Sequence, residues 1–245
     1  MIITSPDNEK LKLVRKLRER RHRDREGLFV TEGEDLVDAG LGAGVKPRFL
    51  LSAAGDGLRG EVVDPGLLDE VSELGSGTRI IGVWPQRFGE PAGPVCLYLH
   101  GIGDPGNVGA IIRTADALVD GSVVLGPDCA DPHSPKAVRA SMGSVFSKPL
   151  ARAGVGATPA TRVALSAHGG EGLDELGAIA PPLTLCLGAE RAGLPAEVLA
   201  VCERQLTIPL RVGGAESLNV AAAAAIACER ISSPTPLHGG SERER

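Results

Sequence analysis

The sequence contains few aromatic residues. Its 245 residues include four Phe, one Trp and one Tyr. Proteins that hold single-stranded nucleic acid by stacking its bases present several aromatic side chains on one surface. So few aromatic side chains leave little material for such a surface. Any recognition of nucleic acid would therefore depend on phosphate contacts and on shape.

The sequence also lacks paired cysteines and long apolar runs. Its five cysteines show neither a CxxC pair nor the Cys/His spacing of a zinc site, and they are Cys96, Cys129, Cys186, Cys202 and Cys228. We predict no metal site, and buried thiols in a reducing compartment. No run approaches the roughly 18 apolar residues of a membrane span, and the first residues do not follow a signal-peptide pattern. We therefore expect a cytoplasmic protein without a membrane partner.

A surface that is cationic overall is excluded as well, because the formal net charge is −5. Any site for a polyanion must be local. The first 26 residues carry nine Lys and Arg against five Asp and Glu. Ser5 and Pro6 predict a helix start, and apolar residues then recur at helical spacing. The charged face supplies the candidate polyanion contacts Arg15, Lys16, Arg18, Arg20 and Arg21. A solvated helix face explains this segment alone equally well.

The pattern of short apolar runs predicts two α/β domains. Residues 1–90 alternate short strands with helices, and a Pro- and Gly-rich linker without periodicity follows at 85–94. Residues 91–231 contain apolar, β-branched strands separated by helices, which indicates a parallel sheet covered on both faces. Residues 232–245 carry Pro, Gly and charge without an apolar period, which predicts a disordered tail.

The first informative loop lies between a strand at 95–100 and a helix. It contains Gly101-Ile-Gly-Asp-Pro-Gly106, and Arg113 falls on the polar face of the helix. Backbone N–H groups at a helix start favour anions, so a cation such as Arg113 is unfavourable there unless an anion binds beside it. Arg113 therefore suggests a phosphate or carboxylate partner. An ion pair with Asp104 or Asp116 is the alternative. The same glycines satisfy GxGxxG with Asp128 downstream, so an NAD-dependent dehydrogenase remains an open reading.

Two later loops also follow predicted strands. The strand at 184–188 ends in Gly188, which permits the close approach of a ligand, and Glu190 follows in the turn. A third strand is interrupted by Pro209 and leads to Ser217, a natural N-cap, and an alanine-rich helix over 217–231. Each loop alone is explained by helix entry and capping.

Taken together, the three loops resemble the signature motifs of the SpoU/TrmH family of SPOUT methyltransferases. The matching residues are Asp104-Pro-Gly-Asn-Val-Gly109 with Arg113, then Gly188, Glu190 and Gly193, then Ile208-Pro209 and Ser217-Leu-Asn219. The segment Ser134–Gly143 resembles the family's middle helix. His100 departs from the pattern, since the family usually carries an acidic residue there. Residues 1–90 resemble the family's small RNA-binding domain more loosely.

The resemblance implies a parallel-sheet SPOUT domain with a C-terminal trefoil knot, a homodimer, and S-adenosylmethionine as cofactor. It places the cofactor against Gly188, Gly193, Ile208, Pro209 and Leu218. The implied catalytic residues are Arg113, Asn107, Glu190, Ser217 and Asn219. A guanidinium with a pKa above about 12 is a poor base, so we expect Arg113 to bind phosphate and stabilise a developing alkoxide.

The implied reaction is methylation of a ribose 2'-hydroxyl in RNA, because only RNA carries that group. We expect 23S ribosomal RNA first and transfer RNA second. The basic residues Arg15, Lys16, Arg18, Arg20 and Arg21 become the candidate RNA contacts. A dehydrogenase and a non-catalytic RNA-binding protein remain the alternatives from other classes.

Overall fold

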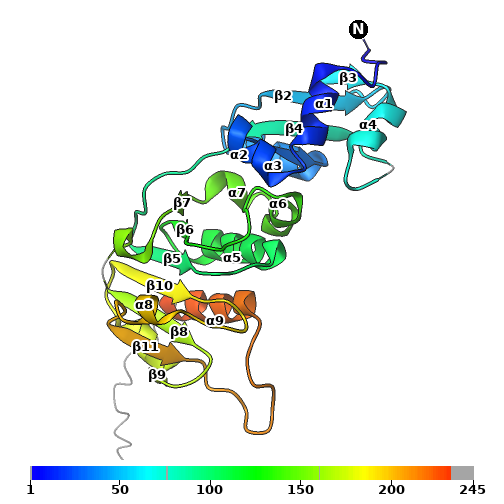
Figure 1. Ribbon diagram of the computed structural model, residues 1–245. Coiled ribbons are helices and arrows are strands. Elements are labelled where there is room, and N and C mark those ends of the chain that lie inside the picture. Colours follow the sequence, from blue (N-terminus) through cyan, green and yellow to red (C-terminus); the bar gives the residue numbers. More distant parts are fainter. Residues whose placement is uncertain (1, 76, 160, 233–245) are drawn as a thin grey trace, which may run out of the picture.

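The computed structural model describes residues 2–75, 77–159 and 161–232, and these form two α/β units, each with its own sheet (Figure 1). The four strands of the N-terminal sheet lie in the order β1 (Leu28–Glu32), β4 (Ile80–Pro85), β2 (Phe49–Ala53) and β3 (Glu61–Val63). β4 is antiparallel to both of its neighbours, whereas β2 and β3 are parallel. The helices of this unit are α1 (Glu9–Lys16), α2 (Arg20–Glu26), α3 (Glu34–Gly42) and α4 (Pro65–Val71).

The basic segment forms two short helices rather than the one we predicted from Ser5 and Pro6. α1 begins later, because Asn8 is its N-cap and accepts a hydrogen bond from the Lys10 backbone N–H at 2.9 Å. α2 ends at Glu26, and its C-cap Gly27 adopts the left-handed conformation with φ +64° that favours glycine. Arg18 consequently lies in the turn between the helices.

The second unit contains a seven-stranded sheet in which every strand pair is parallel. Its strands lie in the order β7 (Leu150–Arg152), β6 (Val123–Leu125), β5 (Val95–Leu99), β10 (Leu183–Leu187), β8 (Arg162–Ser166), β11 (Arg204–Thr207) and β9 (Glu171–Gly172). The predicted parallel α/β fold is therefore confirmed. β7 and β9 were not predicted, because neither carries an apolar run: β7 reads Leu-Ala-Arg and β9 reads Glu-Gly, whereas the equally short β6 reads Val-Val-Leu.

Helices cover both faces of this sheet, and alternate strand residues point to opposite sides. The side of Leu97, Leu99 and Leu185 belongs to the large core, together with buried residues of α5 (Pro105–Leu118) and α9 (Val220–Ser232). The other side, with Tyr98 and Cys186, packs against α8 (Ala196–Leu199). The remaining helices are α6 (Pro135–Ser141), α7 (Ser144–Ser147) and the 3₁₀ helices η1 (Val155–Ala157) and η2 (Leu173–Ala178).

α5 and α6 have the same kind of N-terminal cap, and the two helices pack closely. Each has a capping side chain, Asp104 or Ser134, followed by a proline at the first helical position. A Cβ placed on Gly109 of α5 would lie 2.2 Å from the carbonyl oxygen of Ala137 in α6. Only glycine permits this contact, so α6 fixes the position of α5.

The linker after β4 runs against the second sheet, where the Gly89 backbone N–H donates to the Leu150 carbonyl at 2.8 Å. α9 ends at Ser232, and the rest of the predicted disordered tail lies outside the described residues. Across the described ranges, we find no helix whose length and apolar character would let it cross a membrane.

Candidate active site

A cleft of about 580 Å³ lies at the carboxyl ends of β8, β10 and β11. Ligand sites in open parallel sheets occur at this edge. Leu165 to His168 and Leu187 to Leu194 line it from the first two strands, and Ile208, Leu210 and Glu216 to Leu218 line it from the loop after β11. Val220 and Ala223 of α9 close one side.

Small and apolar side chains form most of the cleft wall, with charge at a few points. Glu190 and Glu216 supply carboxylates, and Arg191 supplies a cation. The wall is therefore mixed in character, and it suits a ligand that combines apolar surface with polar groups and localised charge.

The structure brings together most of the predicted cofactor residues. Gly188, Gly193, Ile208 and Leu218 line the cleft, while Pro209 lies between two residues that do and is not itself part of the lining. The Leu218 side chain is 38% exposed although it is large and apolar. This exposed apolar surface lies at the cleft.

Gly188 is required by the loop itself, in addition to the ligand approach that we predicted. A Cβ at this position would lie 2.3 Å from the carbonyl carbon of Gly193 and 2.4 Å from the backbone nitrogen of Leu194. The loop closes on itself here, since the Gly193 N–H donates to the Ala189 carbonyl at 2.8 Å. The absence of a side chain at Gly188 therefore allows the loop to close, and the closed loop forms part of the cleft wall.

A chain of hydrogen bonds connects the three predicted loops. Asn107 on α5 donates from Nδ2 to the carboxylate of Glu190 in the second loop. Its Oδ1 accepts from Nδ2 of Asn219 in the third loop at 3.0 Å. Asn107 thus holds both loops at once, although 83 and 112 residues separate it from its partners.

Asn219, and not Ser217, caps α9. The Asn219 Oδ1 accepts from the backbone N–H groups of Ala221 at 2.9 Å and Ala222 at 3.3 Å. These are the second and third helical residues, the usual partners of an N-cap side chain. Ser217 lies two residues earlier, on the exposed lining of the cleft. The predicted cap was therefore wrong by two residues, and Ser217 is available to a ligand.

Arg113 is exposed on α5 and does not pair with either predicted carboxylate. Asp104 binds Lys136 at 2.8 Å, and Asp116 accepts from Ser147 at 2.7 Å. Within the described ranges, no carboxylate lies within ion-pair distance of Arg113. It is, however, the ninth residue of α5, so the predicted help from the helix start does not reach it.

The N-terminus of α5 is already occupied by a side chain. The Asp104 carboxylate accepts from the backbone N–H groups of Gly106 at 2.6 Å and Asn107 at 3.2 Å. Its hydrogen bond with Lys136 lowers the pKa of this carboxyl group. A dinucleotide would need these N–H groups for its pyrophosphate. The geometry therefore argues against the dehydrogenase reading of Gly101–Gly106.

Sequence reasoning missed Ser166, Ala167 and His168, which line the cleft after β8. Their position at the end of a predicted strand was the available signal, because carboxyl ends of parallel strands share one edge. It also missed Glu216. No three His, Cys, Asp or Glu side chains in the described part of the chain are grouped so as to hold a metal ion.

Comparison with known proteins identifies the family. Residues 94–229, more than half of the chain, match the model of the SpoU rRNA Methylase family. The chain belongs to the SpoU rRNA Methylase family. Residues 8–88 match the MRM3-like substrate binding domain. The resemblance found in the three loops is confirmed.

Relatives match over nearly the whole chain. The 23S rRNA (guanosine(2553)-2'-O)-methyltransferase RlmP of Bacillus subtilis (strain 168) is 32% identical over 91% of this chain and 96% of its own length. The AdoMet-bound rRNA methyltransferase of Sinorhizobium meliloti is 30% identical, with a TM-score of 0.84 over 97% of this chain and 98% of that one. The SpoU methyltransferase AviRb of Streptomyces viridochromogenes, in complex with AdoMet, is 26% identical, with a TM-score of 0.77 over 92% and 98%.

Proposed function

We propose that this protein transfers a methyl group from S-adenosylmethionine to a ribose 2'-hydroxyl of 23S ribosomal RNA. The observation that carries the proposal is the hydrogen-bonded chain of Glu190, Asn107 and Asn219, which joins three motif loops beside one cleft. The name of the B. subtilis relative, which states this reaction, supports it.

The cleft fits the cofactor in size and charge. Its volume of about 580 Å³ lies within the range of small-molecule sites, roughly 300 to 1,000 Å³. The backbones around Gly188, Gly193, Ile208, Pro209 and Leu218 would hold the adenosyl part. The carboxylates of Glu190 and Glu216 lower the cost of placing a cation there. When bound, the cofactor supplies a methyl group on a positively charged sulfur.

Arg113 would bind an RNA phosphate and stabilise negative charge that develops on the 2'-oxygen. It is exposed and free of a carboxylate within the described residues, so an incoming phosphate meets no competitor. Asn107, Glu190 and Asn219 would hold the loops in register, and Ser217 would contact the cofactor or the phosphate. Positioning of the reactants can then supply several kcal/mol of rate acceleration.

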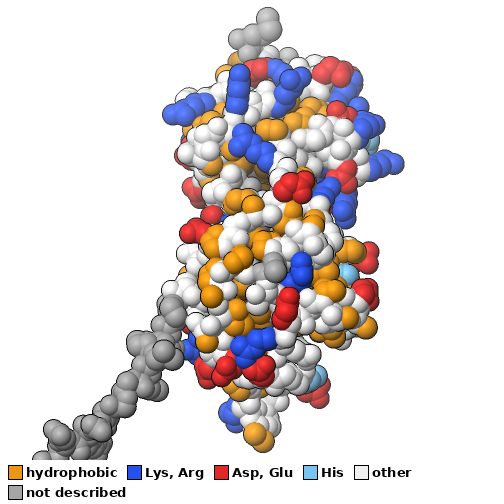
Figure 2. Space-filling view, turned by 90° about the vertical axis from the view of Figure 1, so that its left-hand side faces the viewer, with side chains coloured by type: hydrophobic (Ala, Val, Ile, Leu, Met, Phe, Trp, Pro, Cys, Tyr) orange, Lys and Arg blue, Asp and Glu red, His pale blue; other side chains and the backbone are white. Residues whose placement is uncertain are grey.

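Residues 1–90 would act as the RNA-binding domain and residues 91–231 as the methyltransferase domain. Figure 2 shows Lys and Arg side chains gathered mainly over the upper, N-terminal unit. Arg15, Arg20 and Arg21 form ion pairs with Glu70, Asp24 and Glu19, and Arg18 donates to the Ser72 carbonyl. Exposed ion pairs of this kind contribute little, so phosphates can replace the carboxylates. Lys16 is the fifth of the proposed RNA contacts.

We also propose that the protein works as a cytoplasmic homodimer with a trefoil knot in its C-terminal third, as the family resemblance implies. The exposed apolar side chains of Val212, Leu218 and Ile226 support an interface between copies, and Leu218 lies at the cleft. Burial of such side chains favours association.

Titration calorimetry and a transfer assay test the function together. We expect binding of S-adenosylmethionine and none of NAD, followed by transfer of labelled methyl to unmodified 23S RNA and mapping of the product to one ribose. Binding of NAD alone would indicate a dehydrogenase. RNA binding without cofactor binding would indicate a non-catalytic RNA-binding protein. Transfer of the methyl group to transfer RNA but not to 23S RNA would show that transfer RNA is the substrate instead.

A further inference from the structure

A buried ion pair crosses between the two units. Arg23 of α2 donates from Nε to Oδ2 of Asp131, in the loop after β6, at 2.7 Å. The two side chains are 4% and 3% exposed. Buried charges are rare unless they are paired and hydrogen-bonded, because desolvation costs several kcal/mol per ion.

Both members of the pair are further satisfied. Arg23 also donates from Nη1 to the carbonyls of Leu17 at 2.8 Å and Arg18 at 2.7 Å, at the end of α1. Asp131 accepts the His133 backbone N–H at 3.0 Å. Arg23 therefore connects α1, α2 and the second unit. Because each of these hydrogen bonds is directional, each constrains how the connected parts are oriented.

The next residue of α2, Asp24, forms a second ion pair between the units, in which the acidic side chain lies on α2 and the basic one on the second unit. Asp24 binds Arg152 of β7 at 3.2 Å, and Arg152 also lies 3.7 Å from Asp131. We call Arg23, Asp24, Asp131 and Arg152 the ion cluster. A cation followed by an anion on α2 faces an anion and a cation on the second unit. A shift of α2 by one residue would place like charges together.

Around the ion cluster the interface is aromatic. Phe29 of β1 packs against His133 with ring centroids 4.6 Å apart, and Trp84 of β4 packs against Phe146 of α7 at 4.9 Å. Phe88 of the linker contacts His133 from another side, at 5.2 Å. Apolar burial makes the units adhere, but it is non-directional and does not select one orientation.

We propose that the ion cluster is a positioning device that fixes the orientation of the N-terminal unit relative to α5, so that RNA held by that unit reaches Arg113. The loop with Asp131 leads directly into α6, and Gly109 locks α6 against α5. This inference rests on the proposed RNA methyltransferase function for its kinetic consequence. Its geometric part is independent of that function.

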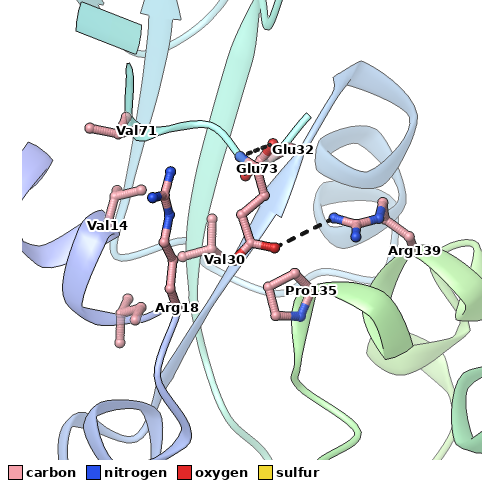
Figure 3. A pocket seen from close by; sticks show the side chains of 9 residues that line it. Val14, Arg18, Val30, Glu32, Val71, Glu73, Pro135 and Arg139 are labelled. Carbon is pink, nitrogen blue, oxygen red and sulfur yellow. Dashed lines mark hydrogen bonds and ion pairs between the residues drawn. The ribbon is translucent and has the colours of Figure 1, made fainter. Parts of the chain in front are cut away.

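A second ion pair crosses the same interface at its edge and serves as the control. Glu73 and Arg139 of α6 are 4.0 Å apart, with side chains 29% and 40% exposed. Figure 3 shows them beside a small crevice that Val14, Arg18, Glu32 and Pro135 also line. Its volume of about 10 Å³ would hold no more than one water molecule. A solvated pair at this distance contributes little to orientation.

The test compares the double variant R23M/D131M with the control R139M. Replacing both buried charges leaves no uncompensated ion, so the double variant should fold where R23M alone could fail. Nitroxide labels on R59C and E197C, in a C202S background, report the distance between the units by pulsed electron paramagnetic resonance. Dilution with unlabelled protein removes distances between copies.

We expect one narrow distance in the parent and in R139M, and a broad distribution in the double variant. The kcat/KM for RNA should fall by about 10-fold or more in the double variant alone, since small misplacements of substrate are costly. Affinity for S-adenosylmethionine should stay within about twofold, because the cleft is lined from β8, β10 and β11. Figure 1 shows these strands on the side of the sheet away from the N-terminal unit.

A narrow, unchanged distance in the double variant would overturn the proposal. A broadened distance with unchanged kcat/KM would overturn the link to RNA positioning. If the parent protein transfers no methyl group, the proposed function fails, and the distance measurement still decides whether the ion cluster orients the units.

Discussion

Arg113 is the residue whose side chain the reaction should need most. It is exposed on α5 and pairs with no carboxylate in the described ranges, so its replacement should break no ion pair of the fold. We expect Arg113→Ala to keep the melting temperature and cofactor affinity, while methyl transfer falls by about 100-fold, the scale of a lost electrostatic donor. Arg113→Lys should recover little, because an ammonium cannot reproduce the planar fork. Single-turnover transfer measures both, and near-normal transfer by the alanine variant would remove Arg113 from catalysis.

His133 should make stability depend on pH. Its ring is buried between Phe29 and Phe88, and burial lowers its pKa from 6.5 to about 4. The unfolded chain therefore binds more protons between those values, so stability is full above pH 6.5 and falls as the pH drops towards 4. The loss amounts to about 3 kcal/mol, at 1.36 kcal/mol per pKa unit.

The variant His133→Phe isolates this effect. The charged groups that act on the imidazole, Asp131, Arg152, Arg23 and Asp24, are present in both proteins. Urea unfolding at several pH values should show a smaller decline below pH 6.5 for the variant. Parallel stability curves for the two proteins would show that the imidazole does not titrate as described.

At the scale of elements, the packing of α5 on α6 depends on the absence of a side chain at Gly109. Gly109→Ala would place a Cβ 2.2 Å from the Ala137 carbonyl, so one helix must move. We expect a loss of about 1 to 3 kcal/mol in the free energy of unfolding, as for other overpacked sites. Gly42→Ala in α3 is the matched control, because its Cβ would meet nothing within 4 Å. Equal stability of the two variants would contradict this account of the α5–α6 contact.

The contact between the three loops depends on Asn107. Asn107→Ala removes its bonds to Glu190 and Asn219, one of them to a charged group. Both bonds are exposed and join loops at the cleft, so their loss should change the melting temperature little. Misplaced loops should lower methyl transfer by about 10- to 100-fold, because small misplacements of the reactants are costly. Single-turnover kinetics beside circular dichroism melting tests this, and a normal rate would show that the loops hold their positions without Asn107.

For the whole molecule, RNA affinity should depend on the charges of α2. The variant R20E/R21E should weaken RNA binding and reduce the slope of log affinity against log salt by about two, if each residue neutralises one phosphate. R59E/R79E changes the net charge equally, elsewhere on the same unit, and should change the slope less. Filter binding over a salt series measures both. Equal effects would mean that net charge, rather than this helix, attracts the RNA.

Deletion of residues 1–90 would be a poor test of the same idea. One hydrophobic core contains Phe29 and Trp84 of the N-terminal unit together with residues of the second unit. Removing the first unit would expose Phe146 and His133, so a loss of RNA binding could not be separated from a loss of structure.

Much of the fold and of the site was predictable from local sequence. Apolar β-branched runs predicted five of the seven parallel strands, and the ordered motifs placed Gly188, Glu190, Ile208 and Leu218 at one edge. Both signals are local, because strand period and turn chemistry are written in neighbouring residues. Ser166 to His168 escaped notice because their loop carries no motif of its own.

What the sequence determined by itself was the family, the parallel sheet and the set of polar residues available for chemistry. Tertiary structure alone decided the partners: Asn107 with Asn219 across 112 residues, and Arg23 with Asp131 across 108. It also decided that Gly188 makes room for the backbone of Gly193, and that Asn219 rather than Ser217 caps α9. The physical reason is that a hydrogen bond, an ion pair or a close backbone contact forms between whichever groups the packed elements bring within about 3 Å, and sequence distance does not record that proximity.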